Sequence, residues 1–485
     1  MTPDLRFTHI DLTGMNVHPM VDAPTVETEA DVTRLFMGSD LPMAVAGMRH
    51  SQGGHTALAG GRMLVTETYN GVRPPVGSSS DNPPDHAVVD AGATWSEIHR
   101  RVCNFRRSTR VQQSSAHFSV GGSLSVNCHG REVRWGPVSD TVEEITVLTG
   151  TGEILQASAA ENTALFRAVL GGYGACGMIL SARLSLAPNR MLYRNWDQLS
   201  VRDYEPVIQR YASLPKATHP FHPTPDALHL HHAWVNVSEH GYMDQVISYT
   251  AKEEQVITSG NHEGHTAWAY RLKAEGWGTS ELLRAGWAVS RLEPGFRTEV
   301  WKRLTSRVNN PSGMEEMRIN LLREDVLFTS SRGDTEGVDL LQEYFVPLDK
   351  LTAFLNDLKA IFPFDNTSTD VALLSSTIRL VKAEWVNPAP LLSYCRGKAM
   401  AGVAIDAHVK RDAHGAPTAK AADRFRQAID AALNRGGTYY LPYHRFATPD
   451  QFKAGYPHCK DWLDVVKRYN PDRRFSNEFL RSLGV

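Results

Sequence analysis

The sequence has few cysteines, and they are poorly placed for any structural role in pairs. Its 485 residues include five cysteines, an odd number, widely scattered and without a CxxC pair. This distribution argues against a disulfide framework and against a cysteine-rich zinc site. We therefore expect neither disulfides nor a metal site.

Long apolar runs and net charge are also missing. No run approaches the roughly 18 apolar residues that a membrane-spanning helix needs. The formal charge of −2 gives no bias toward nucleic acid or an anionic membrane surface. The first residues, MTPDLRFTHIDLTG, are polar and lack the apolar core of a signal peptide. We expect a cytoplasmic protein with no membrane span and no nucleic-acid partner.

Two common phosphate-binding signatures are absent, but a glycine-rich loop is present. The chain contains neither GxxxxGK[ST] nor a GxGxxG that opens a helix. The stretch GMRHSQGGHTAL, residues 47–58, follows the apolar run LPMAVAG, which predicts a buried strand. Glycines let the backbone approach a ligand, and successive N–H groups can form an anion-binding concavity. The stretch is either a pyrophosphate loop or a polar turn with solvated histidines.

The first part of the chain, residues 1–190, alternates strand-like and helical runs without regular βαβ units, which favours an α+β lobe. Thr94, with Glu97 three residues later, predicts a capped helix. VEEITVLTGTGEILQAS predicts a hairpin. ALFRAVLGGYGACGMILSARLSLAP predicts a helix that stops at Gly171 and Gly172, followed by a strand.

The remainder of the chain has a different pattern. Residues 341–437 read strand, helix, strand, strand, helix, which predicts an antiparallel sheet with helices on one face. Tryptophan and histidine gather in LHLHHAWVNV and HTAWAYRLKAEGWG and suggest a lined pocket. The tail predicts a loop and two helices divided by Pro471.

Four segments together resemble one known family. They are AGMRHSQGGHT, SVGGSLSVNCHGREVRWGPVSDTVEEITVLTGTGEI, LFRAVLGGYGACGMILSARLSL and YPHCKDWLDVVKRYNPDRRFSNEFL. In this order they are similar to the segments of the vanillyl-alcohol-oxidase-type, or PCMH-type, FAD-binding family. Within it, the branch of alditol oxidases, sugar-lactone oxidases and the decaprenylphosphoryl-ribose oxidase looks closest.

The resemblance implies an architecture as well as a cofactor. We expect an α+β, two-lobed PCMH-type FAD-binding fold with an antiparallel-sheet substrate domain covered by helices. The FAD-binding domain is expected at residues 1–190 and the substrate-binding domain at 191–439. Residues 440–485 are expected to return to the FAD domain.

The resemblance also implies how FAD is held. His50 stands where family members often join a histidine covalently to the flavin, and His55 is the alternative anchor. A second covalent link is not expected, because Ser114 and Ser115 stand where a cysteine would be needed. We interpret Cys128 as a small buried side chain near the flavin. The residues expected to bind FAD are Gly47, Met48, Arg49, His50, Ser51, Gly54, His55, Ser115, Gly121, Gly122, Ser125, Cys128, His129, Gly130, Gly177 and Ile179.

Candidate catalytic residues come from the strands and the loop expected to face the flavin. Arg379 matches the arginine of a Glu-x-Arg pair in alditol oxidases, whereas Thr377 replaces the glutamate. Asp406 and His408 alternate on one strand and therefore share a face, either for function or as a satisfied structural pair. Tyr443 and His444 lie where the ribose-oxidase branch has a lysine that contacts flavin and substrate. Glu343 is a weaker candidate.

The function implied is FAD-dependent oxidation of a CH–OH group on a sugar, polyol or sugar-bearing metabolite, with hydride transfer to flavin N5 and His408 as the base. The partners would be this small hydroxylated substrate and oxygen or another electron acceptor. An alternative is the oxidative half of an epimerisation that works with a reductase partner. A flavin-binding protein without catalysis is a third reading.

Overall fold

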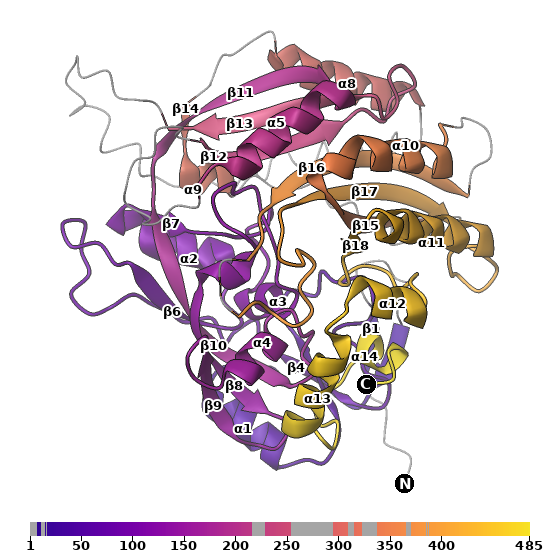
Figure 1. Ribbon diagram of the computed structural model, residues 1–485. Coiled ribbons are helices and arrows are strands. Elements are labelled where there is room, and N and C mark those ends of the chain that lie inside the picture. The colour runs from indigo at the N-terminus through magenta and orange to yellow at the C-terminus, as the bar shows by residue number, and fades with distance from the viewer. Residues whose placement is uncertain are drawn as a thin grey trace.

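The computed structural model describes residues 7–10, 15, 17–215, 228–253, 294–308, 315–322, 337–364, 370–384, 386 and 388–485. These residues form two lobes, drawn one above the other in Figure 1. The lower lobe contains the N-terminal part of the chain, and the upper lobe is built on a large sheet. The stretch HTAWAYRLKAEGWG, at 265–278, lies outside the described residues.

The lower lobe is built on an antiparallel sheet. Its order among the described residues is β5-β6-β10-β8-β9, with β7 pairing the end of β10. A parallel pair, β3-β4, and a hairpin, β1-β2, complete its strands in the described part of the chain. The strands are β1 Phe7–Ile10, β2 Val17–Met20, β3 Met43–Ala46, β4 Arg62–Val65, β5 Val72–Arg73, β6 His86–Asp90, β7 Arg107–Thr109, β8 Val142–Thr149, β9 Ile154–Ser158 and β10 Gly177–Pro188. The helices are α1 Glu29–Met37, α2 Trp95–Val102, α3 Val120–Ser125 and α4 Thr163–Val169.

Local sequence signals explain several of these elements. The apolar run before Gly47 forms β3. The Thr94 hydroxyl accepts a hydrogen bond from the Glu97 amide, and the Glu97 carboxylate accepts one from the Thr94 amide, so the predicted capping box begins α2. β8 and β9 form the predicted antiparallel hairpin. α4 ends before the glycine pair, as expected.

The upper lobe is an antiparallel sheet with the order β14-β11-β13-β12-β16-β17-β15-β18 in the described part of the chain. Its strands are β11 Met191–Ser200, β12 Leu228–Val235, β13 Gln245–Lys252, β14 Glu315–Met317, β15 Gly337–Pro347, β16 Val371–Val381, β17 Met400–Lys410 and β18 Thr438–Tyr439. Its helices are α5 Val201–Ser213, α8 Pro294–Val308, α9 Arg318–Leu322, α10 Leu351–Ile361 and α11 Ala419–Asn434.

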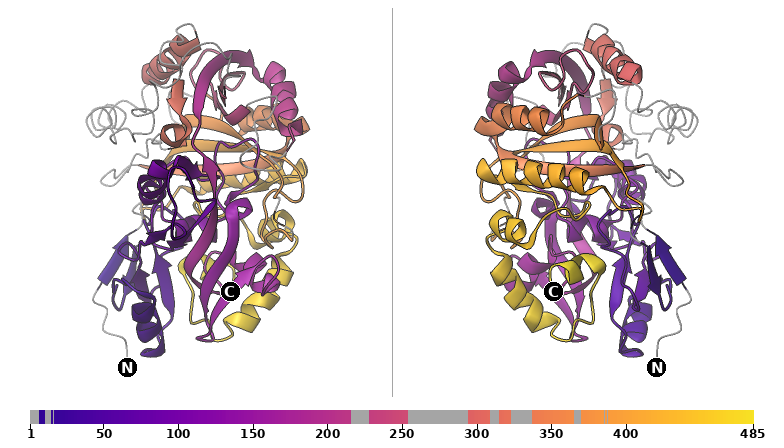
Figure 2. Two further views of the ribbon diagram at one scale, coloured as in Figure 1. Left: turned by 90° about the vertical axis from the view of Figure 1, so that its left-hand side faces the viewer. Right: turned by 90° about the vertical axis from the view of Figure 1, so that its right-hand side faces the viewer.

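Helices cover the outer face of this sheet and leave its inner face toward the lower lobe. Figure 2 shows α5, α10 and α11 along the outer side. α10 buries Leu351, Phe354, Leu355 and Leu358, which recur at helical spacing. The sheet-and-helix arrangement predicted for residues 341–437 is therefore confirmed, and the inner face is free to form a site.

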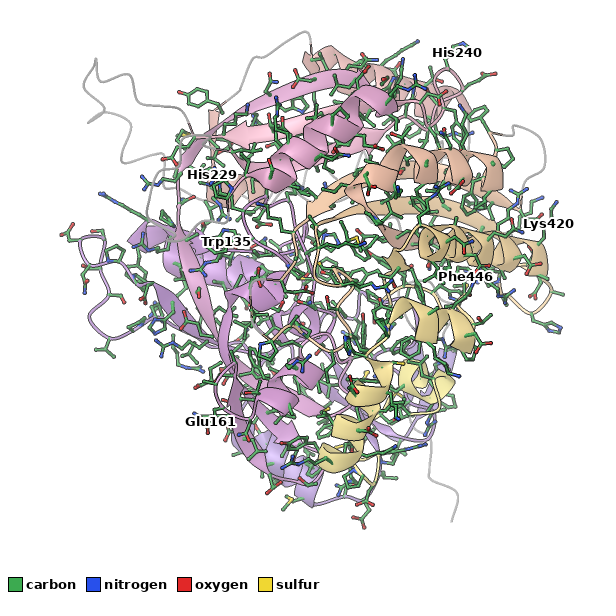
Figure 3. All side chains as sticks on the ribbon, in the orientation of Figure 1. Trp135, Glu161, His229, His240, Lys420 and Phe446 are labelled. Carbon is green, nitrogen blue, oxygen red and sulfur yellow. The ribbon has the colours of Figure 1, made fainter. Side chains whose placement is uncertain are left out.

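The last part of the chain contacts both lobes. β18 pairs with β15 of the large sheet. Phe446 stacks on Phe425 of α11, with ring centroids 4.4 Å apart (Figure 3). Further along, Phe475 stacks on Phe36 of α1 at 5.1 Å. The predicted domain limits at residues 190 and 440 remain a prediction.

The tail contains one more helix than its sequence pattern predicted. In the described residues it forms α12 Pro449–Gly455, α13 Cys459–Tyr469 and α14 Glu478–Ser482. Pro471 lies between α13 and α14, where a break was expected. The helix not predicted is α12, whose seven residues were read as part of a loop.

Within the described residues, no helix combines the length and the apolar character needed to cross a membrane.

Candidate functional site

A cavity of about 830 Å³ lies between the two lobes. Its volume is in the range of cofactor and substrate sites, typically some 300–1,000 Å³. One wall consists of lower-lobe loops, and the other consists of the inner face of the large sheet together with α8. The cavity therefore needs both lobes and the C-terminal segment, which contributes Tyr440, Tyr443 and Asn477.

The glycine-rich loop after β3 forms part of the lower wall. A Cβ atom on Gly47 would stand 2.0 Å from the Ser119 hydroxyl, so only glycine lets this loop lie so close to the segment that begins α3. Arg49, in the same loop, has a φ of 57°, in the left-handed region. The loop is held between two segments and turned sharply at the cavity's edge.

His50 and His55, the two possible flavin anchors, have different surroundings. His50 is half-buried and packs edge-on against Phe118, with ring centroids 4.3 Å apart. Burial, with the nearby charges of His117 and Arg49, lowers the pKa of His50 to about 4, so its imidazole is neutral at neutral pH. His55 is buried, stacks on Phe479, and its Nε2 lies 3.1 Å from the Leu441 carbonyl oxygen.

The upper wall is a polar sheet face. Strand alternation turns Asp339 and Glu343 of β15, Thr377 and Arg379 of β16, and Asp406 of β17 toward the cavity. Polar side chains on an inward face are costly unless they are satisfied or used. This face is the natural place for chemistry on a bound substrate.

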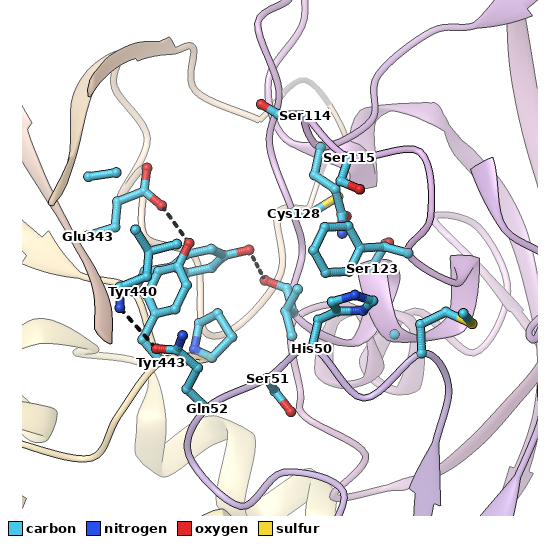
Figure 4. Close-up of a pocket in the computed structure, with 18 of the residues that line it drawn as sticks. His50, Ser51, Gln52, Ser114, Ser115, Ser123, Cys128, Glu343, Tyr440 and Tyr443 are labelled. Atoms are coloured by element: carbon cyan, nitrogen blue, oxygen red, sulfur yellow. Dashed lines mark hydrogen bonds between the residues drawn. The ribbon is translucent and has the colours of Figure 1, made fainter. Parts of the chain in front are cut away.

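Glu343 is the centre of a buried hydrogen-bonded group on this wall. Its Oε1 lies 3.0 Å from Nε2 of His129, which comes from the lower lobe. The Tyr443 hydroxyl donates to its Oε2 at 3.4 Å. Burial and the neighbouring Glu343 charge raise the pKa of Tyr443 well above its usual value, so the phenol keeps its proton and acts as a donor. Figure 4 shows Glu343, Tyr440 and Tyr443 across the cavity from His50, Ser115 and Cys128.

His408, expected as the base, is not among the residues that line the cavity. It shares a sheet face with Asp406, as its spacing predicted, but its Nδ1 lies 2.8 Å from Oδ1 of Asp339 on the adjacent strand. Its ring also fills the space beside Gly337, where an added Cβ would be 2.1 Å from Nε2. Asp339 therefore holds the ring at the cavity's border.

His444 also lies elsewhere. It lines a second, smaller cavity of about 270 Å³ with Tyr439, Phe452 and Phe479. Burial, with the charge of Arg445, lowers its pKa to about 4. The side chains of Tyr443 and His444 therefore line different cavities, although the two residues are adjacent in the chain.

Most of the residues expected to bind FAD line the large cavity. Of that set, only Gly54 and Gly130 do not. Gly130 still has a structural role, because a Cβ there would stand 2.0 Å from the Gln112 carbonyl oxygen. Burial raises the pKa of the Cys128 thiol far above its usual value, which agrees with a small buried side chain and not with a reactive thiolate.

The sequence reasoning missed Asp339 and His232, and it ranked Glu343 low. His232 and Trp234 both line the cavity from β12. The pattern LHLHHAWV contained the signal, since its alternating positions share one face of a strand. Asp339 carried no comparable signal, because its importance comes from its register opposite His408.

The cavity fits FAD in its shape and in its lining. Its volume is large enough for FAD. Where Gly47 packs on Ser119, the cavity wall consists of backbone and small side chains. Gly121, Gly122, Ser115, Ser123 and Ser125 continue this lining. Such a surface lets a flat ring system and a phosphate chain approach the backbone closely.

A comparison with protein families identifies this part of the chain. Residues 20–158 match the FAD binding domain family. Together with the two-lobed α+β architecture, this match makes the fold a PCMH-type FAD-binding fold, as predicted, and makes FAD the cofactor. The match does not extend to the large sheet.

Curated relatives are similar over part of their length. The chain is 31% identical over 205 residues to cytokinin dehydrogenase 5 of Arabidopsis thaliana, a match that covers 39% of this chain and 37% of the relative. It is 32% identical over 170 residues to an uncharacterized oxidoreductase of a fasciation locus in Rhodococcoides fascians, covering 35% and 37%. It is 32% identical over 209 residues to cytokinin dehydrogenase 7 of Oryza sativa subsp. japonica, covering 41% and 38%. Each match thus spans little more than a third of the relative's length.

Proposed function

We propose that this chain is an FAD-dependent oxidoreductase that oxidises a CH–OH group of a sugar, polyol or sugar-bearing metabolite. The observation that carries the proposal is Glu343, a carboxylate that faces the cavity and is held by one group from each side. His129 fixes one oxygen and Tyr443 the other. A carboxylate positioned in this way suits removal of a hydroxyl proton.

The roles of the residues follow from their positions. FAD, when bound, accepts the two electrons that leave the carbon. Glu343 accepts the proton of the substrate hydroxyl, and Tyr443 and His129 keep its carboxylate in one orientation. Thr377, Asp406 and Ser375, also on the cavity wall, offer hydrogen bonds to further hydroxyls of a polyol. We assign His408 no role in proton removal.

We further propose that FAD is bound covalently through His50. The half-buried imidazole lines the cavity, and its low pKa leaves it neutral and able to act as a nucleophile. His55 is the less suitable anchor, because its Nε2 is already engaged at Leu441 and its ring is stacked on Phe479.

A second candidate function comes from the names of the relatives. Two of the relatives described above are cytokinin dehydrogenases, so dehydrogenation of a cytokinin is the alternative to be tested. The similarity covers about two fifths of this chain at most. The polar side chains of the upper wall favour the hydroxylated substrate, because Thr377, Asp406 and Ser375 offer hydrogen-bond partners to its hydroxyl groups.

The test is anaerobic bleaching of the flavin by a substrate panel. Xylitol, sorbitol and aldonic acids represent the first function, and a cytokinin represents the second. With whichever compound reduces the flavin, Glu343→Gln is expected to slow reduction about 10²–10⁴-fold, the usual effect of losing a general base. Oxygen consumption then separates an oxidase from a dehydrogenase.

His408→Gln is the matched control, since it alters a titratable side chain on the same sheet face but outside the cavity. It is expected to leave the rate of flavin reduction unchanged. A Glu343→Gln protein that reduces its flavin at the wild-type rate would remove Glu343 as the base. Bleaching by the cytokinin alone would replace the first function with the second.

A further inference from the structure

The cavity contains a guanidinium that has no carboxylate partner among the described residues. Arg379 of β16 lines the upper wall, and its Nη2 donates a hydrogen bond to the Ser114 hydroxyl, at 3.2 Å. Its Nη1 is shielded from solvent and has no hydrogen-bond partner within the part of the chain that the structure describes. No described carboxylate lies within ion-pair distance of it. Buried charges are normally paired, because desolvation is costly.

Other positive or donor groups lie around Arg379. His232 stands directly opposite it on the adjacent strand, since Ala233 pairs with Ile378. His232 is 2% exposed, lines the cavity, and has an Nδ1 without a partner among the described residues. The pKa values of Arg379 and His232 both lie below their usual ranges. Burial and the charge of Arg131 lower the pKa of Arg379 to about 9, and burial with both arginines lowers that of His232.

Arg131 belongs to the same end of the cavity. Its carbonyl oxygen accepts a hydrogen bond from the His231 amide, which fixes the Arg131 backbone beside β12. Its Nη1 donates to the Leu321 carbonyl oxygen at 3.4 Å, and the residue lines the cavity. Arg379, Arg131 and His232 therefore lie in the same part of the cavity as the Ser114 hydroxyl.

The two buried carboxylates nearest this region have other partners. Glu132 influences Arg131, but its Oε1 lies 3.7 Å from Nη2 of Arg318. Glu343 influences Arg379, but its two oxygens are engaged by His129 and Tyr443. Glu343 is on β15 and Arg379 on β16, with β17 between them. Two strand spacings separate their backbones by about 10 Å. The cavity thus has a carboxylate end and a guanidinium end that one small molecule can span.

We propose that Arg379, His232, Arg131 and Ser114 form an oxyanion subsite, and that the substrate carries a carboxylate or phosphate in addition to the hydroxyl that is oxidised. This inference rests on the proposed function and narrows its substrate class. Planar guanidinium groups bind carboxylates and phosphates through paired hydrogen bonds, which lysine does not reproduce. The glycine-rich loop of the lower lobe, which would hold the flavin phosphates, is a separate part of the cavity wall.

The test measures anion binding directly, without turnover. FAD-loaded protein is titrated with inorganic phosphate and, separately, with acetate, while heat and flavin absorbance are recorded. The two titrations distinguish a phosphate-bearing from a carboxylate-bearing substrate. Arg379→Gln is expected to weaken binding about tenfold or more, as for loss of a charged hydrogen bond, and Arg379→Lys to restore only part of it.

Arg303→Gln is the matched control. Arg303 is an exposed arginine of α8 that does not line the cavity, so its loss removes the same charge outside the subsite. It is expected to leave the dissociation constant nearly unchanged. If Arg303→Gln and Arg379→Gln weakened binding equally, the anion would be held only by general electrostatic attraction, and the subsite would be overturned. Loss of FAD from Arg379→Gln would assign Arg379 to the cofactor and overturn it as well.

Absence of saturable binding of either anion at millimolar concentration also overturns the subsite. A substrate panel separates this failure from failure of the proposed function. Glycerol and glycerol 3-phosphate, or xylitol and xylonate, form pairs that differ in the anion. The anionic member is expected to have the higher kcat/KM, and Arg379→Gln to remove that preference. If neither member bleaches the flavin while phosphate still binds, the CH–OH function fails and the oxyanion subsite stands.

Discussion

Three histidines that attract notice in the sequence acquire different properties from their surroundings. His50 faces the large cavity, His408 is held by Asp339 at its border, and His444 lines the smaller cavity. All three are hydrogen-bonding groups that could serve chemistry, yet position leaves only His50 beside the expected flavin. The function of a titratable residue in this molecule is decided by which cavity its side chain enters.

At the same scale, the flavin bond can be tested with two variants. The wild-type protein is expected to keep its yellow colour after precipitation with trichloroacetic acid, because the proposed covalent bond to His50 would survive unfolding. His50→Ala is expected to release all of its FAD into the supernatant. His55→Ala, the control, is expected to retain the colour, since His55 is stacked on Phe479 and its Nε2 is engaged at the Leu441 carbonyl. Free FAD in the wild-type supernatant would contradict the covalent bond but not FAD binding.

Alternation in the sequence correctly placed Asp406 and His408 on one face of a strand. It could not reveal that Asp339, 69 residues earlier, lies opposite His408 and holds its ring. Glu343 was likewise hard to rank, because its two partners come from the lower-lobe segment at His129 and from the loop at Tyr443. Local periodicity predicts which side chains share one face of a strand. It does not predict which residues of distant segments they contact, because those contacts depend on strand register and on how the two lobes pack together.

Among the elements, those with local start and stop signals were predicted well. α2 has its capping box, α4 ends at its glycine pair, and β8 and β9 form a hairpin. α12 was missed although its signal was present. Thr448, Pro449 and Gln451 combine a capping box with proline at the start of the helix. With only seven residues, no apolar periodicity supports those signals.

The segment between α13 and α14 provides a stability prediction at the scale of elements. Phe475 is 2% exposed and stacks on Phe36 with an interplanar angle of 13°. Phe475→Ala is expected to lower the free energy of unfolding by about 3–5 kcal/mol, the usual cost of removing a buried phenyl ring. Because Phe475 also lines the cavity, the variant is expected to retain less FAD. Urea unfolding followed by tryptophan fluorescence measures the first effect, and flavin absorbance after gel filtration measures the second.

The control for Phe475→Ala is Lys467→Ala, which shortens an exposed side chain of α13. It is expected to change the free energy of unfolding by no more than about 0.5 kcal/mol. Equal stability of the two variants would show that the contact between α1 and the C-terminal segment contributes little.

For the whole molecule, buried histidines predict sensitivity to acid. Burial lowers the pKa of His55 and His231 to about 3, and that of His50 and His444 to about 4. Between these values and the ordinary pKa of 6.5, the unfolded chain binds protons that the folded chain does not. Stability therefore falls as pH decreases below 6.5, by about 1.4 kcal/mol per pH unit for each such histidine.

The predicted loss of stability at acidic pH is checked by measuring the free energy of unfolding in urea at a series of pH values. Below pH 6.5, His444→Gln is expected to make the unfolding free energy fall less steeply with decreasing pH. The expected change in this slope is about 1.4 kcal/mol per pH unit, which corresponds to one proton. His458→Gln is the control, since His458 is exposed and is expected to leave the slope unchanged. A stability that stays constant from neutral pH down to about 4.5 would contradict the buried, neutral state of these histidines.

The position of residues 440–485 has a consequence for the order of events during synthesis. Tyr440, Pro442, Tyr443 and Asn477 form part of the cavity wall, and the amide of Gln52 in the glycine-rich loop donates to the Pro442 carbonyl oxygen. Synthesis reaches these residues after the other described segments that line the cavity. We therefore expect the large cavity to stay open on one side until they have been made, and a chain that stops before residue 440 to retain less FAD.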